Sequence, residues 1–235
     1  MKKTLHNADT RGVAEHGWLS SRHTFSFAGY HNPERMGFGL LRVINDDVVQ
    51  PGMGFGTHSH EDMEIISIPL SGELHHKDSM GNVEGITKGE VQVMSAGTGI
   101  THSEFNGSKS EIVNFLQIWV IPENRGIKPR YDQRLFSTDE RQGRFQNIVS
   151  PDKNDEGSWI NQQAWFWLGD YKVGQADTYT IKRSGNGAYF FVLEGAVAVA
   201  GEQLERRDGL GIEDAKSVDF EVNEDCQLLV MDVPV

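Results

Sequence analysis

The segment Gly52-Met-Gly-Phe-Gly-Thr-His-Ser-His60 contains two histidines separated by one residue. If this segment is a β-strand, side chains two positions apart lie on the same face, so His58 and His60 can share one metal ion. With nine histidines in the chain, a single pair at this spacing also arises by chance. The pair therefore predicts a metal site only if the sequence contains a second pair of candidate ligands.

A second segment, Gly97-Thr-Gly-Ile-Thr-His-Ser-Glu104, has the same spacing between an imidazole and a carboxylate. Two such strands crossing inside a barrel would bring both pairs to one point. Three imidazoles and one carboxylate are typical of a mononuclear divalent-metal site with open positions for substrate and dioxygen. Spacing leaves the fourth ligand open between Glu64 and Glu104, because Glu64 shares a face with His58 and His60 if their strand runs unbroken.

Short apolar runs bounded by glycine, aspartate and asparagine recur along the whole chain, whereas helical periodicity is scarce. Such runs predict an all-β sandwich or barrel rather than alternating strands and helices. The runs cover residues 39–44, 64–70, 90–94 and 112–121 in the first half, and 188–193, 196–200 and 228–233 in the second.

Two internal matches indicate that the chain can contain two copies of one β-module. Residues 69–74 resemble residues 192–197 at an offset of 123, and residues 88–91 resemble residues 207–210 at an offset of 119. Hairpins built as strand, glycine and strand also look alike without duplication, so these matches leave duplication and coincidence both open. In a duplicated chain, the connection would fall in the polar stretch 125–143.

The composition excludes several classes of protein. The chain has 235 residues, with 22 Lys plus Arg against 34 Asp plus Glu, so its formal net charge is −12. We expect no direct binding to nucleic acid, because phosphate backbones are bound mainly through Lys and Arg. The chain lacks an apolar stretch of about 18 residues and a signal-like N-terminus, which predicts a cytoplasmic protein that does not enter a membrane.

Cys226 is the single cysteine, and its apolar neighbours predict a buried thiol.

All nine histidines lie within the first 102 residues. If the chain has two modules, only the first can hold an imidazole-rich metal site, and the second is a scaffold, a lid or an interaction surface. The histidines are His6, His16, His23, His31, His58, His60, His75, His76 and His102.

Two spacing patterns carry a family resemblance. The pattern G-x5-H-x-H-x3-E over residues 52–64, followed by G-x-x-H-x3-N over residues 99–106, resembles the two motifs of the cupin superfamily. More narrowly, the chain resembles bacterial proteins of the pirin family, densely over roughly the first 130 residues and loosely beyond. The segments that carry this resemblance are residues 11–18, 23–27, 42–46, 58–64, 78–81, 94–100 and 117–119.

The resemblance implies a bicupin, with two β-barrel modules arranged face to face. It implies a metal-binding cupin domain over residues 1–132 and a second cupin domain without metal ligands over residues 133–235. The implied cofactor is a divalent metal ion, iron(II) in most pirins, with manganese, nickel, cobalt, copper or zinc as alternatives. The implied metal ligands are His58, His60, His102 and Glu104.

Two features depart from the general cupin pattern. The proline expected before the histidine of the second motif is absent, and a Gly97-Thr98-Gly99 turn stands there. The gap from Glu64 to Gly72 is also one residue longer than the pattern has. Both departures are usual in pirins, so the implied site is unchanged.

Pirins of this kind are similar to quercetin 2,3-dioxygenases, which open a flavonol ring with dioxygen and release carbon monoxide. The resemblance implies a planar phenolic substrate and O2, with Glu104 both as a ligand and as the catalytic base that accepts the proton of the 3-hydroxyl. The alternative is a redox-sensitive iron-binding regulator that acts on a protein partner, such as a transcription factor or a metabolic enzyme. Pirins also resemble monomers more than obligate assemblies, so we expect a monomer.

Other residues receive smaller roles. His75 and His76 precede a turn, and we expect them to support this turn or to be exposed. We expect Glu64 to orient an imidazole inside the barrel. His23 and the neighbouring aromatic residues are interpreted as core with some pocket wall. The tryptophans Trp159, Trp165 and Trp167 are interpreted as packing residues.

Overall fold

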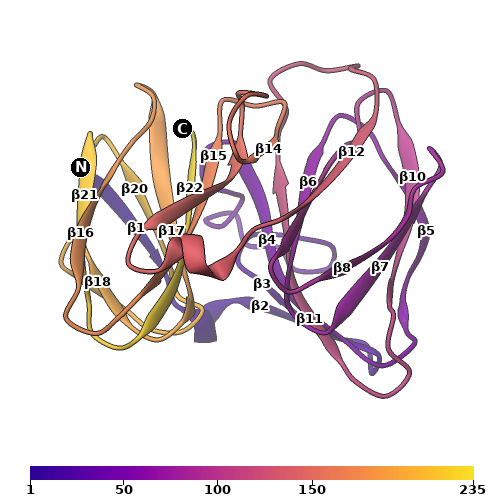
Figure 1. Cartoon of the computed structure of the whole chain (residues 1–235), viewed down its shortest axis with the longest axis horizontal. Helices are drawn as coiled ribbons and strands as arrows, with labels where there is room; N and C mark the ends of the chain where they lie inside the picture. Colours follow the sequence, from indigo (N-terminus) through magenta and orange to yellow (C-terminus); the bar gives the residue numbers. More distant parts are fainter.

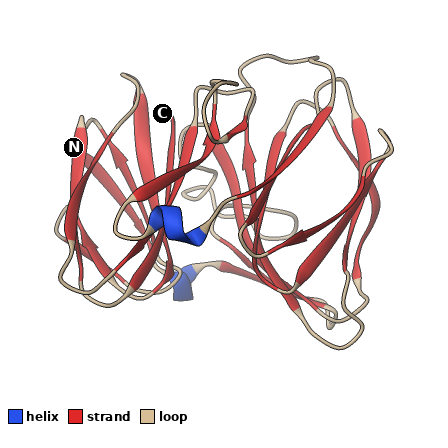
Figure 2. Ribbon diagram, in the orientation of Figure 1, coloured by secondary structure: helices blue, strands red, loops and turns tan.

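Two β-modules of the same construction lie side by side in the computed structural model, which describes residues 1–235 (Figure 1). Each module has one seven-stranded and one four-stranded sheet. Apart from the short 3-10 helices η1 (Ala8–Thr10) and η2 (Thr138–Arg141), the chain consists of strands and loops (Figure 2). The predicted all-β architecture of two barrel-like modules is therefore confirmed.

The strands of the first module are β2 (Gly12–Glu15), β3 (Leu19–His23), β4 (Leu41–Val49), β5 (Gly54–His60), β6 (Glu64–Ser71), β7 (Glu73–Asp78), β8 (Val83–Thr87), β9 (Glu90–Ser95), β10 (Ile100–Asn106), β11 (Val113–Val120) and β12 (Arg130–Leu135). Those of the second are β1 (Lys2–His6), β13 (Phe145–Ser150), β14 (Ser158–Trp159), β15 (Trp165–Tyr171), β16 (Ala176–Thr180), β17 (Asn186–Glu194), β18 (Val197–Val199), β19 (Glu202–Leu204), β20 (Gly209–Glu213), β21 (Ser217–Val222) and β22 (Cys226–Pro234).

The strand order is the same for β4–β11 of the first module and β15–β22 of the second, whereas the outer strands differ: β2 and β3 pair antiparallel, but β13 and β14 pair parallel. The large sheets run β12-β9-β6-β11-β4-β3-β2 and β1-β20-β17-β22-β15-β13-β14, and the small sheets run β5-β10-β7-β8 and β16-β21-β18-β19. The matched hairpin glycines Gly72 and Gly195 have φ of +75° and +81°, a left-handed conformation that favours glycine. At both positions a Cβ would lie within 2.6 Å of a backbone carbonyl oxygen. The internal matches in the sequence therefore mark equivalent turns.

The N-terminal strand crosses to the second module. Residues 2–6 form β1, which pairs with β20, whereas the sequence places residues 1–132 in the first domain. In the first module, the equivalent edge position beside β9 is taken by β12, which continues to Leu135. Both strands cover an edge whose backbone groups would otherwise lack partners. A domain boundary after residue 132 stays a proposal. It differs from the structure in one respect, because β1 belongs to a sheet of the second module.

The largest core lies between the two seven-stranded sheets, which face each other at the centre of the molecule (Figure 1). Its 24 buried residues come from both modules, for example Leu41 and Ile118 from the first and Phe191 and Leu229 from the second. Burial of apolar surface at about 25 cal/mol per Å² makes this shared layer the main link between the modules.

The two barrels differ in what fills them. The second is packed with a cluster of 16 buried apolar residues that includes Phe190, Phe220 and Cys226, which confirms the buried thiol. The first has two smaller apolar clusters, of six and four buried residues. Much of its remaining interior is polar, and Gln92, His102 and Glu104 are all buried. The interior of the first barrel is therefore more polar than that of the second.

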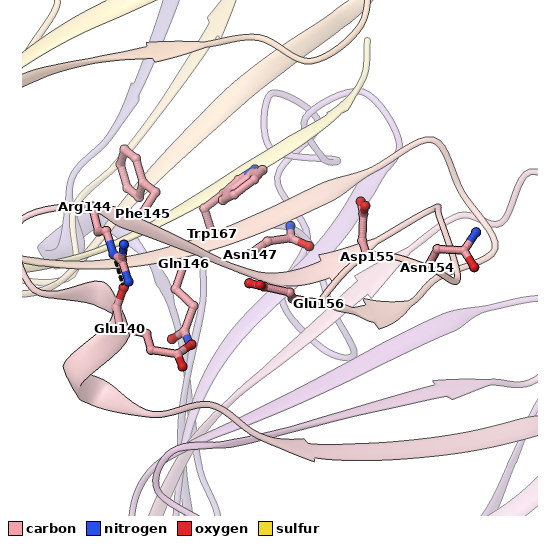
Figure 3. A pocket seen from close by; sticks show the side chains of 9 residues that line it. All are labelled: Glu140, Arg144, Phe145, Gln146, Asn147, Asn154, Asp155, Glu156 and Trp167. Atoms are coloured by element: carbon pink, nitrogen blue, oxygen red, sulfur yellow. Dashed lines mark hydrogen bonds between the residues drawn. The ribbon is translucent and has the colours of Figure 1, made fainter.

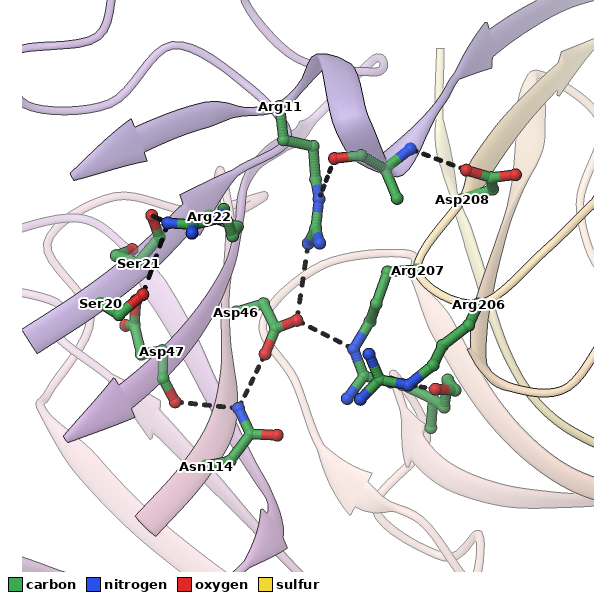
Figure 4. A network of polar contacts seen from close by, with 12 residues as sticks. Arg11, Ser20, Ser21, Arg22, Asp46, Asp47, Asn114, Arg206, Arg207 and Asp208 are labelled. Carbon is green, nitrogen blue, oxygen red and sulfur yellow. Dashed lines mark hydrogen bonds and ion pairs between the residues drawn. The ribbon is translucent and has the colours of Figure 1, made fainter. Parts of the chain in front are cut away.

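A buried ion-pair network joins the modules beside this core (Figure 4). Asp46 of β4 accepts a 2.8 Å hydrogen bond from Nε of Arg207, in the second module, and lies 3.6 Å from Nη1 of Arg11. The arginine side chains are 3% and 6% exposed, respectively. Asp208 accepts a bond of 2.7 Å from the backbone N–H of Ala8. One carboxylate thus links the N-terminal segment, the first module and the second module.

We expect Asp46→Ala to lower the free energy of unfolding by about 3–5 kcal/mol, because it leaves the buried Arg11 without an ion-pair partner and Arg207 with only its 3.6 Å contact to Glu194. Urea denaturation followed by circular dichroism measures this change. Glu15→Ala is the matched control, since it removes an exposed 2.6 Å ion pair with Arg22 and should hardly move the midpoint. Equal losses in the two variants would contradict a special role for the buried network.

Candidate metal centre

The three histidines of the two spacing patterns meet inside the first barrel. Strands β5 and β10 are antiparallel neighbours, and their register places His58 directly opposite His102. A bulge after His102 shifts the register so that Glu104 lies opposite Phe55. The bulged strand approaches β5 so closely that a Cβ on Gly54 would lie 2.2 Å from the carbonyl oxygen of Glu104. Glycine at this position therefore permits the packing of the two strands.

The imidazoles of His58, His60 and His102 form one compact group. Their ring centroids are 4.4–4.9 Å apart, and their ligand atoms lie within 4.8 Å of one another. Nδ1 of His58 bonds to the carbonyl oxygen of Gly56 at 2.8 Å, which leaves its Nε2 free. Nε2 of His60 and Nε2 of His102 are buried without a hydrogen-bond partner. Such orphaned nitrogens are the atoms that a divalent metal would satisfy.

The electrostatics of the group favour metal binding. Burial, reinforced by the neighbouring histidines, lowers the pKa of His60 to about 4 and that of His102 to about 3. Both imidazoles are therefore neutral at pH 7, and a neutral imidazole has the lone pair that a metal requires.

Glu104 faces the same interior but has other close neighbours. Its carboxylate accepts bonds from Nε2 of Gln117 at 2.8 Å and from Oγ of Ser67 at 3.4 Å. Its ligand atom forms a second compact group, within 4.8 Å, with those of His76 and His102. His102 is thus common to both groups, and Glu104 as the fourth ligand stays a proposal.

Glu64 lies apart from the imidazoles, so the expectation that it orients one of them is wrong. Its Oε2 accepts bonds from Oγ of Ser95 at 2.8 Å and from the backbone N–H of Asn161 at 3.2 Å. The strand does not run unbroken from His60, because Asp62 takes a left-handed φ of +45° and ends β5 before β6 begins. Glu64 therefore lies at the contact with the second module. Burial raises its pKa to about 7.

The expectation that His75 and His76 support the turn or are exposed agrees with the structure, although His76 contacts the turn residue Asp78 from a buried position. Strand β7 extends through both, and its residues alternate between exposed and buried up to Asp78. His75 points outward and pairs with Glu73 at 2.9 Å, whereas His76 is buried beside His102. The alternation of Leu74, His76 and Asp78 along one strand is the signal that could have placed His76 inside.

A cavity of about 410 Å³ opens beside the histidine group. Aromatic side chains form much of its wall, and Asp47, whose pKa burial raises to about 7, lies at its inner face. Of the aromatic residues near His23, Phe27 and Phe55 line the cavity, whereas Phe25 and Phe38 lie in the central core. The lining residues used below are Trp18, Phe27, Phe55, Trp119, Asp47 and Glu104.

A larger cavity, of about 580 Å³, lies on the second module (Figure 3). Its wall carries the acidic residues Glu140, Asp155 and Glu156 with Arg144 and Trp167, and it contains neither histidine nor cysteine. Lys182 lies over the ring of Trp167 at 4.5 Å, and Lys153 over Trp159 at 4.7 Å. The smaller cavity, which lies beside the group of His58, His60 and His102, is therefore the candidate site.

Two barrels whose eight central strands have the same order, packed face to face with a histidine cluster inside one of them, define a bicupin with a candidate metal centre. Residues 6–120 match the family model for pirin, and residues 147–233 match that for the quercetinase C-terminal cupin domain. A quercetin 2,3-dioxygenase of Escherichia coli is 44% identical over 98% of both chains. A pirin-like protein of Caulobacter vibrioides is 38% identical over 95% of this chain and 96% of its own. The chain belongs to the pirin family.

The solved structures agree with this assignment. The bacterial pirin YhhW of Escherichia coli, in complex with nickel(II), is 42% identical, covers 99% of both chains and has a TM-score of 0.94. A quercetin 2,3-dioxygenase of Acinetobacter baumannii, at 22% identity and a TM-score of 0.78, shares the fold. None of the helices in this chain has the length and apolar character needed to cross a membrane.

We expect Glu64→Gln to stabilise the protein by at most about 3 kcal/mol at pH 8 and by less than about 1 kcal/mol at pH 5. Because the pKa of Glu64 is about 7 in the folded state and 4.5 in the reference state, the folded state keeps a proton that the unfolded state releases. Wild-type stability therefore falls as pH rises from 4.5 to about 7. Thermal unfolding at both pH values tests this, with Glu84→Gln, at an exposed position, as the control. A pH-independent difference would contradict it.

Proposed function

We propose that this chain is a metal-dependent dioxygenase that opens the ring of quercetin-like flavonols with O2 and releases CO. The observation that carries the proposal is the convergence of three imidazoles, two of them with orphaned Nε2 atoms, beside an aromatic cavity of about 410 Å³. The volume lies in the usual range for small-molecule sites. The name of the Escherichia coli relative supports the same chemistry.

We propose His58, His60, His102 and Glu104 as the metal ligands, with iron(II) as the ion and manganese, nickel, cobalt, copper or zinc as alternatives. The nickel(II) complex of YhhW supports a divalent ion in this family without deciding which one this chain takes. When bound, such an ion supplies Lewis acidity and open coordination positions for an anionic substrate oxygen and dioxygen.

The chain's own residues bind the substrate and handle its proton. Trp18, Phe27, Phe55 and Trp119 offer flat apolar faces to a planar phenol and exclude water from the cavity. Glu104, the proposed catalytic base, takes the proton of the 3-hydroxyl, and Gln117 holds its carboxylate in place.

Asp47 provides a second ionisable carboxyl group in the same cavity. Burial raises its pKa to about 7, and its Oδ1 is buried without a hydrogen-bond partner. A carboxyl group with this pKa can donate a hydrogen bond to a substrate oxygen when protonated and accept one when ionised. Asp47 thus complements Glu104 from another wall of the cavity.

The relatives named quercetin 2,3-dioxygenase do not favour the alternative role, a redox-sensitive regulator of a protein partner. The monomeric state and the cytoplasmic location stay predictions.

Oxygen uptake and loss of the flavonol absorbance band, measured with quercetin, test the proposed reaction. We expect turnover by protein reconstituted with at least one of Fe(II), Mn(II), Ni(II), Co(II), Cu(II) or Zn(II), and a loss of at least about 100-fold in His58→Ala and Glu104→Ala. His75→Ala, at the exposed neighbouring position on β7, should retain full activity. Metal binding without oxygen uptake with any ion would contradict the proposed reaction while leaving the metal centre intact.

A further inference from the structure

A buried pair of side chains lies behind His102, outside the proposed set of ligands. Nδ1 of His76 is 3.4 Å from Nδ1 of His102, and Nε2 of His76 is 3.1 Å from Oδ2 of Asp78. The side chains of His76 and Asp78 are both 0% exposed. The ring of Tyr131 covers His76, with a centroid distance of 4.8 Å and an interplanar angle of 34°. The pair is therefore shielded from water.

The surroundings of Asp78 define its role as an acceptor. Oδ1 accepts bonds from the backbone N–H groups of Met80 at 2.9 Å and Asn82 at 3.1 Å, and Oδ2 accepts one from Nδ2 of Asn82 at 2.8 Å. Burial alone would raise the pKa of Asp78, but the hydrogen bonds from Asn82, His76 and Met80 outweigh it and hold this pKa below its ordinary value. An ionised carboxylate accepts only, so the 3.1 Å contact requires the proton of His76 on Nε2.

The position of the proton on His76 also determines which nitrogen of His102 is protonated. A neutral His76 with its proton on Nε2 has a lone pair on Nδ1, which can accept a bond from Nε2 of Gln92 at 3.3 Å. The same lone pair faces Nδ1 of His102, so the contact between the rings is a hydrogen bond only if His102 carries its proton on Nδ1. The lone pair of His102 then lies on Nε2, the buried nitrogen without a partner.

We propose that Asp78 and His76 are positioning residues that fix the tautomer and the ring orientation of His102, so that its Nε2 faces His58 and His60. This inference rests on the proposed metal centre but not on the flavonol reaction. Partners of this kind make a metal-bound imidazole more basic and hold its ring in place. His76 acts through His102 and is not itself a ligand in this arrangement.

The group of His76, His102 and Glu104 also suggests a different use, as a second metal position. If His102 already binds one ion through Nε2, a second ion at its Nδ1 would require the ring to lose both protons. A neutral imidazole has one N–H and one lone pair, so this bridge needs an imidazolate. The series of hydrogen bonds from Asp78 through His76 to His102 satisfies the same atoms with neutral rings and a single ion. It is therefore favoured over a second metal position.

Nitrogen-15 NMR of the metal-free protein tests the tautomers directly. We expect the proton of His102 on Nδ1 and that of His76 on Nε2, and we expect Asp78→Asn to disturb both, because an amide can donate to Nε2 of His76. The exposed His75 is the internal reference, since it shares the strand but not the network. A proton on Nε2 of His102 in the wild-type protein would overturn the proposal whether or not the enzyme acts on flavonols.

Titration with Co(II), followed by its visible absorption, tests the consequence for the metal. We expect one ion per wild-type chain and an affinity about 10–100-fold lower in His76→Phe, with an altered cobalt spectrum. His76→Asn should recover part of the affinity, because its carbonyl oxygen can replace Nδ1 as the acceptor. His75→Phe should bind like the wild type.

Two results of this titration would overturn the inference. The first is unchanged affinity and spectrum in both His76→Phe and Asp78→Asn, with both variants folded by circular dichroism. The second is two ions per wild-type chain falling to one in His76→Phe, which would make His76 a ligand. Normal cobalt binding without flavonol turnover would instead count against the proposed function alone.

Discussion

The packing of the two seven-stranded sheets against each other is the interaction on which the rest of the structure depends. A barrel that holds several buried imidazoles and carboxyl groups gives up much of the apolar burial that stabilises a domain. In this chain the 24-residue layer between the modules and the 16-residue core of the second barrel supply that burial elsewhere. The first barrel can therefore keep a polar interior and a cavity. This difference between the modules agrees with the distribution of the histidines, all of which lie in the first 102 residues.

Duplication explains how such a difference can arise from one topology. Strands β4–β11 of the first module and β15–β22 of the second have the same order in their sheets, and Gly72 and Gly195 occupy equivalent hairpin turns. These turns were visible in the sequence because left-handed backbone restricts the choice of residue. The interiors have diverged, since β21 places Val218, Phe220 and Val222 on its buried face, where β10 has His102 and Glu104. The exchange of β1 could not be predicted, because a five-residue strand carries no signal for which sheet edge it covers.

The candidate site was predictable as far as local periodicity reaches. Alternation along a strand correctly placed His58 near His60, and the same rule put His102 and Glu104 on one face of β10. The rule failed for Glu64, because a single left-handed residue, Asp62, ends the strand that periodicity extends. On β7 the same alternation turns His76 inward, up to the turn that begins at Asp78. Spacing alone does not define where a strand ends.

The three histidines are held by three different supports, and this difference indicates which of them depends most on the tertiary fold. His58 is fixed locally, by a bond from its Nδ1 to the carbonyl of Gly56, two residues earlier on the same strand. His60 packs edge-on against Trp119, with ring centroids 4.9 Å apart at 85°. His102 takes its support from β7 through His76, and only after β7, its following turn and β10 have assembled. The orientation of His102 therefore depends on the longest series of contacts outside the donor set, from His76 to Asp78 and the turn after β7.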